Sequence, residues 1–372
     1  MKKIGITGQN GFVGKHLYNT LNLNPDLYTI IEFKKDYFND ELKLDAFVVQ
    51  CDTIVHLAAM NRHESQEFIY ETNIKLVNQL IDSLERTNSK VHILFSSSSQ
   101  EEKDNLYGKS KKEGREKLVQ WAEKSGGKVN GIVIPNVFGP FGKPFYNSFI
   151  ATFCYQLTHK ETPSIAVDGE VQLIFVSELV KEIIEIINKE EHNDFLIINS
   201  TSKVKVSDVL NLLQNFKSNY FERGEIPALN NTFDLNLFNT FRSYIDHTNF
   251  FPVKFTQHID PRGAFVEVIR LGIGGQVSFS TTVPGITRGN HFHTRKIERF
   301  SVIKGKAIIQ LRKIDSDEVI DLFLDGSEPA YVDMPIWYTH NIKNIGEEEL
   351  YTIFWINEFY NPEDADTYFV EV

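Results

Sequence analysis

The 372-residue sequence has few cysteines, fewer basic than acidic residues and no long apolar run. Its two cysteines, Cys51 and Cys154, form no CxxC pair, which excludes a disulfide framework and a thiolate zinc site as organising features. The 39 basic residues face 50 acidic ones, for a net charge of −11, so neither nucleic acid nor an anionic membrane is an expected partner. No apolar run approaches the roughly 20 residues that span a bilayer. We therefore expect a folded protein of the cytoplasm.

Short apolar runs alternate with amphipathic segments in the N-terminal part of the chain. Alternation of this kind is typical of βαβ units around a parallel sheet. Strands are predicted at residues 2–7, 29–33, 53–59, 91–97 and 130–136, and helices at 73–86, 110–126, 177–190 and 206–216. We therefore expect a Rossmann-type, doubly wound α/β domain over residues 1–245.

The pattern changes near residue 245, beyond which helical periodicity is nearly absent. Many short strands separated by turn residues favour a sandwich or a small barrel. The strands are predicted at residues 265–271, 275–282, 299–313, 318–324, 330–335 and 349–359. We therefore expect a second, all-β barrel domain over residues 246–372.

The first predicted strand leads into a glycine-rich turn and then a helix. Glycines permit a tight turn and close backbone approach, and a helix N-terminus offers free N–H groups to a pyrophosphate. A glycine turn alone often only reverses the chain, but one at the start of a βαβ run predicts a dinucleotide site. The candidate cofactor-binding residues here are Gly8, Gly11, Phe12, Val13 and Gly14.

The end of the second predicted strand bears on the choice between NAD and NADP. Glu32 suits the ribose 2′-hydroxyl of NAD, whereas Lys34 and Lys35 suit the 2′-phosphate of NADP. We expect NADPH, with the two lysines as phosphate contacts. The alternative is a solvated charge cluster after a strand.

A YxxxK motif follows the serine-rich end of the fourth predicted strand. If a helix starts near Tyr107, then Tyr107 and Lys111 share one of its faces. An ammonium group lowers the pKa of a neighbouring phenol, which can then exchange a proton near neutral pH, and a nearby serine can hold a carbonyl oxygen. We therefore predict a proton relay for hydride transfer to or from a ketone. The alternative is an ordinary exposed helix start.

Residues 1–245 resemble the extended short-chain dehydrogenase/reductase family. The matching stretches are TGQNGFVG, HLAA, TNIKLVN, FSSSS, YGKSK and PNVFGP. The resemblance implies that Ser98, Tyr107 and Lys111 are the catalytic residues, with Ser97 as the alternative serine.

The same resemblance places two further residues. Ala58 would lie along the cofactor, and Asn136 would face a nucleotide-sugar substrate, although an asparagine before a turn often only caps the chain. One stretch departs from the sugar 4,6-dehydratases of the family, which usually carry an Asp-Glu pair where this chain has Ser99-Gln100. The departure favours ketone reduction over dehydration, but Glu101 and the glutamate after it leave dehydration open.

Three histidines and a glutamate in the C-terminal part suggest a metal site. His291 and His293 would point to one face of a strand, and Glu298 follows them closely. The fourth candidate ligand is His340. This donor set suits zinc, iron, manganese or nickel, with zinc as the default for a site without a redox signal. The alternative is a pair of histidines that merely pack or hydrogen-bond.

This segment resembles both sequence motifs of the cupin superfamily. The first motif matches at every spacing, and the second keeps Pro335, His340 and Asn344 but has Trp337 in place of its usual glycine. Some relatives of this barrel epimerise deoxysugars. Four candidates for an epimerase base stay open: His293, Tyr338, Lys304 and Lys306.

The two halves in this order resemble the bifunctional reductases of capsular-polysaccharide and O-antigen synthesis. The protons beside the carbonyl of a 4-keto sugar are acidic, so a base could invert a centre before the ketone is reduced. The resemblance implies C3 epimerisation of a UDP-4-keto-2-acetamido-2,6-dideoxyhexose, then NADPH-dependent reduction at C4 to UDP-2-acetamido-2,6-dideoxy-L-talose, a precursor of N-acetyl-L-fucosamine. It also implies a zinc-bearing homodimer. The alternatives are a reductase with a structural metal, and a non-catalytic sensor of cofactor and sugar.

Overall fold

The protein, seen here as a computed structural model, forms two compact units. The structure describes residues 1–261 and 263–372. The first unit comprises Met1–Ile150 and Val167–Val206, and the second comprises Ala151–Ala166 and Ser207–Val372. The change of pattern at residues 245 and 246 thus falls inside the second unit, where helices that precede it pack with the β-rich part. The domain boundary at that point stays a prediction.

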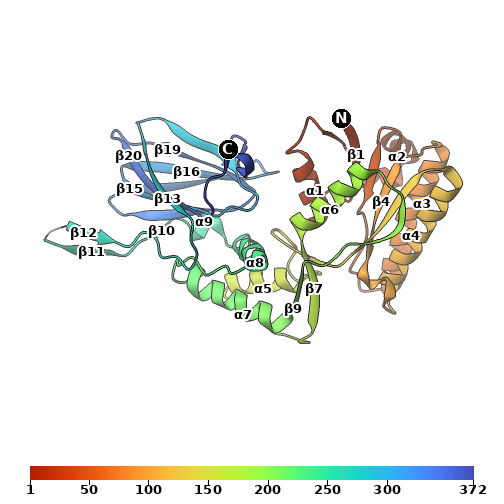
Figure 1. Cartoon of the computed structure of the whole chain (residues 1–372), viewed down its shortest axis with the longest axis horizontal. Helices are drawn as coiled ribbons and strands as arrows, with labels where there is room; N and C mark the ends of the chain where they lie inside the picture. Colours follow the sequence, from red (N-terminus) through yellow and green to blue (C-terminus); the bar gives the residue numbers. More distant parts are fainter. Residues whose placement is uncertain (262) are drawn as a thin grey trace. The chain divides into compact units, whose positions relative to one another are not determined.

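The first unit is built around a six-stranded parallel sheet (Figure 1). Adjacent residues of its strands belong to different core clusters: Ile54 packs on one face and Val55 on the other. Strands covered on both faces are near-continuous apolar runs, which is why the sequence predicted them well. In sheet order the strands are β2 (Tyr28–Ile31), β1 (Lys2–Thr7), β3 (Thr53–His56), β4 (His92–Ser98), β5 (Lys128–Ile134) and β8 (Asn193–Ile197).

Helices cover both faces of this sheet. Helices α1 (Phe12–Leu21) and α6 (Val176–Lys189) contribute to one core cluster, whereas α2 (Glu41–Val48), α3 (Gln66–Arg86) and α4 (Leu106–Ser125) contribute to the other. The doubly wound arrangement is therefore confirmed. The remaining elements of this unit are η1 (Lys35–Asn39), η2 (Ser99–Glu102) and a small sheet of β6 (Asn136–Phe138), β7 (Glu170–Phe175) and β9 (Ser202–Lys205).

The second unit contains two five-stranded sheets around a common apolar core, as expected for an all-β domain. One sheet has the order β10 (Val253–Lys254), β18 (Ala330–Met334), β15 (Glu298–Lys304), β20 (Leu350–Ile356) and β13 (Gln276–Thr282). The other has the order β17 (Val319–Asp325), β16 (Lys306–Lys313), β19 (Tyr338–Asn344), β14 (Thr287–Phe292) and β21 (Tyr368–Phe369). Strands β11 (Gln257–Asp260) and β12 (Gly263–Val266) form a separate pair, so the strand predicted at 265–271 is wrong beyond Val266.

Helical segments pack against this β-rich part within the second unit. A buried polar cluster joins them: Arg299 pairs with Asp333 at 2.8 Å, and the hydroxyl of Tyr220 donates to the same carboxylate at 2.7 Å. Such a cluster is stable when each buried group is satisfied by a partner. The helical elements are α5 (Phe149–Thr158), α7 (Val206–Phe216), η3 (Lys217–Phe221), α8 (Thr232–Arg242), α9 (His247–Phe250) and η4 (Pro362–Asp364).

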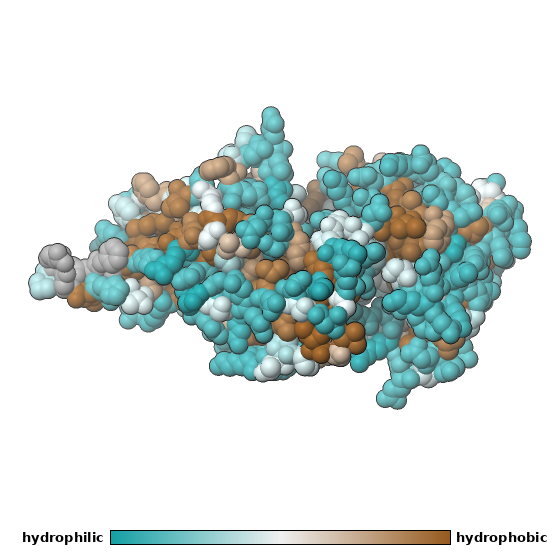
Figure 2. Space-filling model, turned by 60° about the horizontal axis from the view of Figure 1, so that its bottom comes forward, coloured by the Kyte–Doolittle hydropathy of each residue, from teal (hydrophilic) through white to brown (hydrophobic). Residues whose placement is uncertain are grey.

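Apolar residues gather on the visible face of the β-rich part, at the left of the view in Figure 2. Among the exposed apolar side chains of this unit are two on the edge strand β13, Val277 (58% exposed) and Phe279 (73% exposed). Within the described ranges, no helix is both long and apolar enough to cross a membrane.

Candidate functional site

The glycine-rich turn connects β1 to α1 in the geometry that a dinucleotide site requires. Gly8 has a φ of +76°, and a Cβ there would lie 2.8 Å from the backbone nitrogen of Ala58. A Cβ on Gly14 would lie only 2.3 Å from the carbonyl oxygen of Gly8. Phe12 is the first residue of α1, and no side chain caps this helix, so its N-terminal N–H groups can serve an anion. The predicted turn residues therefore lie together, beside Ala58.

The charged residues after β2 lie where the sheet order predicts the adenosine ribose. Glu32 and Lys34 form an exposed ion pair with 3.4 Å between the Lys34 Nζ and Glu32 Oε1 atoms. Lys35 begins η1 and is also exposed. Both a carboxylate and ammonium groups are therefore present at this position, and the choice of NADPH over NADH stays a prediction.

Tyr107 and Lys111 lie on the first turns of α4. The side chain of Asn105 caps this helix by accepting from the Gly108 N–H at 2.7 Å, which confirms the expected helix start. The buried Lys111 Nζ donates to the carbonyl oxygen of Ser96 at 2.9 Å and lies 5.9 Å from the centre of the Tyr107 ring. The end of β4 and the start of α4 thus bring the relay residues together.

The two serines that the sequence left open have different partners. The Ser98 side chain lies close enough to the Tyr107 phenol to lower its pKa, and its hydroxyl oxygen accepts from the Gln100 N–H at 3.2 Å. The Ser97 hydroxyl instead donates to the carboxylate of Glu101. The geometry therefore favours Ser98 as the serine of the relay, and its catalytic role stays a prediction.

Burial dominates the proton affinities of the relay. Burial raises the pKa of Tyr107 to about 12, and the bond from Ser98 offsets this only in part. Burial also lowers the pKa of Lys111 to about 8, although the charge of Glu101 opposes the shift. The expectation that Lys111 lowers the phenol pKa is wrong in this structure. A protonated phenol is, however, the form that can donate a proton to a ketone oxygen during reduction.

A buried ion pair next to the relay was not anticipated. Arg115 donates to both oxygens of Glu101, with an Nε–Oε1 distance of 2.9 Å and an Nη2–Oε2 distance of 2.8 Å. Both side chains are almost inaccessible, at 11% and 5% exposed. Since Glu101 is engaged by Arg115 and Ser97, it is poorly placed to eliminate water. Glu101 and Arg115 are 14 residues apart and on different elements, so a local sequence pattern could not have predicted this ion pair.

Two loops near the relay are tied together by Arg62. Its Nη1 atom donates to the carbonyl oxygens of Phe145, at 2.6 Å, and Tyr146, at 2.9 Å. Tyr146 lies close enough to Tyr107 to influence its pKa. The predicted substrate residue Asn136 is exposed and donates to the Gln172 carbonyl at 3.2 Å, so its amide also has a purely structural partner.

The second unit gathers the four predicted metal ligands. Ligand atoms of His291, His293, Glu298 and His340 all lie within 4.8 Å of one another. His291 on β14 pairs directly with His340 on β19, whereas Glu298 begins β15 in the other sheet. The Glu298 Oε2 atom is 3.0 Å from the His293 Nε2 and 3.3 Å from the His340 Nε2. Both sheets therefore contribute to one compact cluster.

The state of these four residues fits a divalent cation. The His293 Nε2, Glu298 Oε2 and His340 Nε2 atoms are buried, and none has a hydrogen-bond partner of good geometry among the described residues. Buried polar atoms left in this way normally serve a ligand or an ion. Burial alone would raise the pKa of Glu298, but the two histidines outweigh it and hold that pKa well below its usual range. Burial lowers the pKa of His291 to about 4, which keeps that imidazole neutral and able to ligate.

Trp337 occupies a backbone position that favours glycine. Its φ is +62°, which explains why the corresponding position in the cupin motif is usually glycine. The buried indole stacks on Phe292, with ring centres 5.5 Å apart, and the backbone N–H of Trp337 donates to the His293 carbonyl at 2.8 Å. The turn therefore accommodates the bulky side chain by packing it on Phe292.

Comparisons with known proteins match both parts of the chain. Residues 4–199 match the NAD dependent epimerase/dehydratase family, and residues 258–368 match the polysaccharide biosynthesis C-terminal domain. The UDP-2-acetamido-2,6-beta-L-arabino-hexul-4-ose reductase of Pseudomonas aeruginosa is 30% identical over 368 residues, 98% of each chain. The chain belongs to this reductase family. The resemblance of its two halves to the reductases of polysaccharide biosynthesis is therefore confirmed.

Among the solved structures, some matches cover the whole chain. The capsular polysaccharide assembling protein CapF from Staphylococcus aureus matches over 100% of both chains, with 37% identity and a TM-score of 0.64. The protein RMD from Pseudomonas aeruginosa, solved with NADPH, matches 59% of this chain at 19% identity and a TM-score of 0.52, which bears on the fold alone. The spore coat polysaccharide biosynthesis protein SpsL of Bacillus subtilis is 28% identical over 123 residues, 30% of this chain and 82% of its own.

Proposed function

We propose that the chain reduces the 4-keto group of a UDP-linked 2-acetamido-2,6-dideoxyhexose with NADPH, in polysaccharide biosynthesis. We further propose that it first inverts C3, so that the product is UDP-2-acetamido-2,6-dideoxy-L-talose. The substrate class is carried over from the name of the Pseudomonas relative. The observation that carries the reductase is the half-buried Tyr107 at the start of α4, beside Ser98 and with the buried Lys111 ammonium 5.9 Å from the centre of its ring.

The reduction follows from what these residues can do. NADPH supplies the hydride when it is bound at the glycine turn. Ser98 and Tyr107 would hold the ketone oxygen by hydrogen bonds, and Tyr107 would give its proton to that oxygen as the carbonyl becomes a hydroxyl. Lys111, held by the Ser96 carbonyl, would keep a positive charge near the phenolate that forms.

The epimerisation is assigned to the second unit. His291, His293, Glu298 and His340 would hold the ion, for which zinc is our proposal and which would stabilise negative charge on the sugar oxygen beside C3. Of the candidate bases, Lys304 and Lys306 are exposed and lie near the carboxylates of Glu348 and Asp325.

A structural metal is the second candidate for this site. Four protein ligands, three of them buried, complete the coordination that structural zinc prefers, whereas catalytic zinc usually keeps a position open. His291 is the most accessible of the four, so it is the ligand whose place a substrate could most readily approach.

Product analysis separates these candidates. The protein would be incubated in deuterated water with a UDP-linked 4-keto-6-deoxy amino sugar, with and without NADPH, and the products identified by NMR. Deuterium at C3 without NADPH, and a C4 hydroxyl only with NADPH, are the expected results. Two results together would favour a reductase with a structural metal. They are the absence of C3 exchange in every sample, and reduction of an already epimerised substrate by protein from which a chelator has removed the metal. No turnover of any 4-keto sugar would contradict the proposal as a whole.

We also propose that the chain forms a homodimer. The exposed Val277 and Phe279 on the edge strand β13 support an interface there, because apolar edge strands pair readily with another chain. Light scattering should give the mass of two chains, and Phe279→Asp should shift it toward one. An unchanged mass for this variant would place the interface elsewhere.

A further inference from the structure

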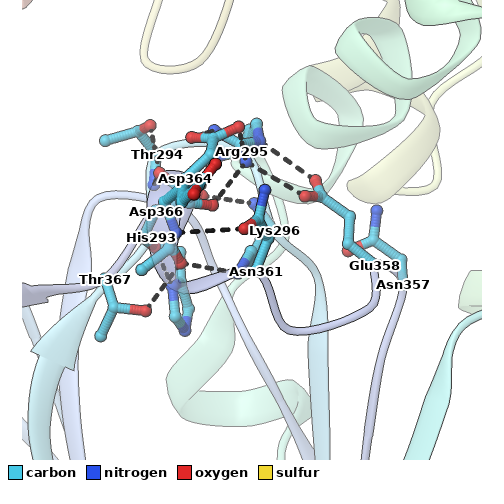
Figure 3. A network of polar contacts seen from close by, with 12 residues as sticks. His293, Thr294, Arg295, Lys296, Asn357, Glu358, Asn361, Asp364, Asp366 and Thr367 are labelled. Atoms are coloured by element: carbon cyan, nitrogen blue, oxygen red, sulfur yellow. Dashed lines mark hydrogen bonds and ion pairs between the residues drawn. The ribbon is translucent and has the colours of Figure 1, made fainter.

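The C-terminal residues 361–369 lie against the loop that follows the metal-binding strand. Figure 3 shows this loop, with Thr294, Arg295 and Lys296, beside Asp364 and Asp366. The Asp366 carboxylate is buried and accepts four hydrogen bonds from the loop: from the Thr294 N–H at 3.1 Å, the Thr294 hydroxyl at 2.6 Å, and the N–H groups of Arg295 and Lys296 at 3.0 Å each. One side chain thus holds three successive residues.

The backbone of the same aspartate contacts a metal ligand. The Asp366 carbonyl oxygen accepts a hydrogen bond from the His293 Nδ1. A carbonyl oxygen can only accept, so the proton of this ring must sit on Nδ1. The Nε2 atom therefore faces Glu298 and His340, as a ligand atom must.

The backbone at Asp366 is held in an unusual conformation. Its φ is +41°, in the left-handed region, which aspartate adopts more readily than most residues. The four bonds to its carboxylate and a bond from the Lys296 Nζ to the Ala365 carbonyl at 2.6 Å fix the segment there. The direction of the Asp366 carbonyl consequently depends on the side chain of the same residue.

We propose that Asp366 is a positioning residue for the metal ligand His293. Its carboxylate fixes the loop and its own backbone, and its carbonyl sets the tautomer and orientation of the imidazole. Groups that orient a ligating histidine in this way commonly change metal affinity by about 10- to 100-fold when they are lost. The inference rests on the metal site proposed above and adds the residue that prepares it.

The chain offers a matched control two residues away. Asp364 also accepts hydrogen bonds from the loop, from Arg295 Nη1 at 3.0 Å and Nη2 at 2.8 Å. Its side chain is 66% exposed, and Arg295 keeps Glu358 as a second partner. Asp364 therefore ties the same two segments together without touching a metal ligand.

The test is a titration of metal-free protein with Co²⁺, followed by the visible absorption of the bound ion. Asp366→Ala should weaken Co²⁺ binding by about 10- to 100-fold and change the absorption bands, which report the ligand geometry. Asp364→Ala should leave the bands unchanged and the affinity within about twofold. Thr294→Val, which removes a single bond to Asp366, should give an intermediate loss and serves if Asp366→Ala does not fold.

Each result bears on the inference. Equal losses of Co²⁺ affinity in Asp366→Ala and Asp364→Ala would mean that Asp366 only holds the two segments together. That result would overturn the inference. Unchanged affinity and bands in Asp366→Ala, or in Thr294→Val where that variant is used, would overturn it as well. Failure of the unsubstituted chain to bind Co²⁺ or Zn²⁺ would instead overturn the metal site itself, and this inference with it.

Discussion

The two candidate sites differ in how far the protein satisfies its own polar groups. In the reductase site Lys111 donates to the Ser96 carbonyl, and the Glu101 carboxylate accepts from Arg115 and from the Ser97 hydroxyl. In the metal cluster the inward-facing atoms of His293, Glu298 and His340 have no such partner among the residues described. The first site is organised before any ligand arrives, whereas the second leaves buried atoms for something else to bind.

Because of this difference, the loss of one residue should affect the stability of the folded protein differently at the two sites. A side chain that acts only on the reacting atoms can be removed with little effect on stability, because its neighbours keep their partners. Removal of one member of a buried, charged cluster leaves the others desolvated and uncompensated. Variants at the two sites should therefore separate activity from stability.

The largest effect is expected at Tyr107. Tyr107→Phe removes the proton donor but keeps the ring, so NADPH oxidation should fall by about 100- to 10,000-fold while the protein stays folded. Exchange of the C3 proton and the metal content should not change. Spectrophotometric assay of NADPH and NMR of the sugar measure the two activities, with Tyr155→Phe as a control tyrosine in the other unit. Joint loss of both activities in a folded variant would contradict the separation of roles.

A comparable effect on the second unit is expected from His340. His340→Ala should lower the bound metal from one ion per chain to a small fraction, measured by elemental analysis. The unfolding transition of the second unit should shift to lower temperature, because metal binding contributes to folding free energy. NADPH binding should persist. The exposed His63 provides a control, and a metal content equal in His63→Ala and His340→Ala would remove His340 from the site.

A moderate loss of stability is expected at Trp337. Truncation of a buried tryptophan costs about 3–5 kcal/mol, and relief of its left-handed backbone returns about 1–2 kcal/mol. Trp337→Gly should therefore lower the free energy of unfolding by roughly 1–4 kcal/mol, and Trp337→Ala by about 1–2 kcal/mol more, since alanine keeps the backbone strain. Denaturant unfolding measures both. Equal losses would show that the positive φ carries no strain.

The fold and most candidate residues follow from local pattern. Buried parallel strands and amphipathic helices leave periodic signals, which is why the predicted strands and helices of the first unit recur in the structure. The spacing of His291 and His293 likewise placed two ligands on one strand end. Such patterns capture contacts along one element or between motifs of fixed spacing.

The residues that support the two sites, such as Asp366 and Arg62, cannot be found from a local sequence pattern. Asp366 and His293 are 73 residues apart, and Arg62 is 84 residues from Tyr146. Each contact depends on where loops from different elements meet. The pKa of Tyr107 was mispredicted for a related reason, because the spacing to Lys111 is local whereas burial is set by the whole fold.

The smallest expected effect concerns the pH dependence of reduction. Lys111 has a pKa lowered to about 8 by burial, so its positive charge is present below that pH and lost above it. The rate of reduction should fall as the pH rises through about 8. Because the charge of Glu101 opposes the lowering, Glu101→Gln should move this fall to lower pH, and Arg115→Gln, which leaves the carboxylate uncompensated, should move it to higher pH.

These two variants form a matched pair, since each breaks the same ion pair and should cost similar stability. Only the sign of the shift distinguishes an electrostatic effect on Lys111 from general loosening of the site. Rate profiles across the pH range, measured at saturating NADPH, give that sign. Shifts in the same direction, or none in either variant, would mean that Lys111 does not set the alkaline limb, and that the reductase site is less self-sufficient than its hydrogen bonds indicate.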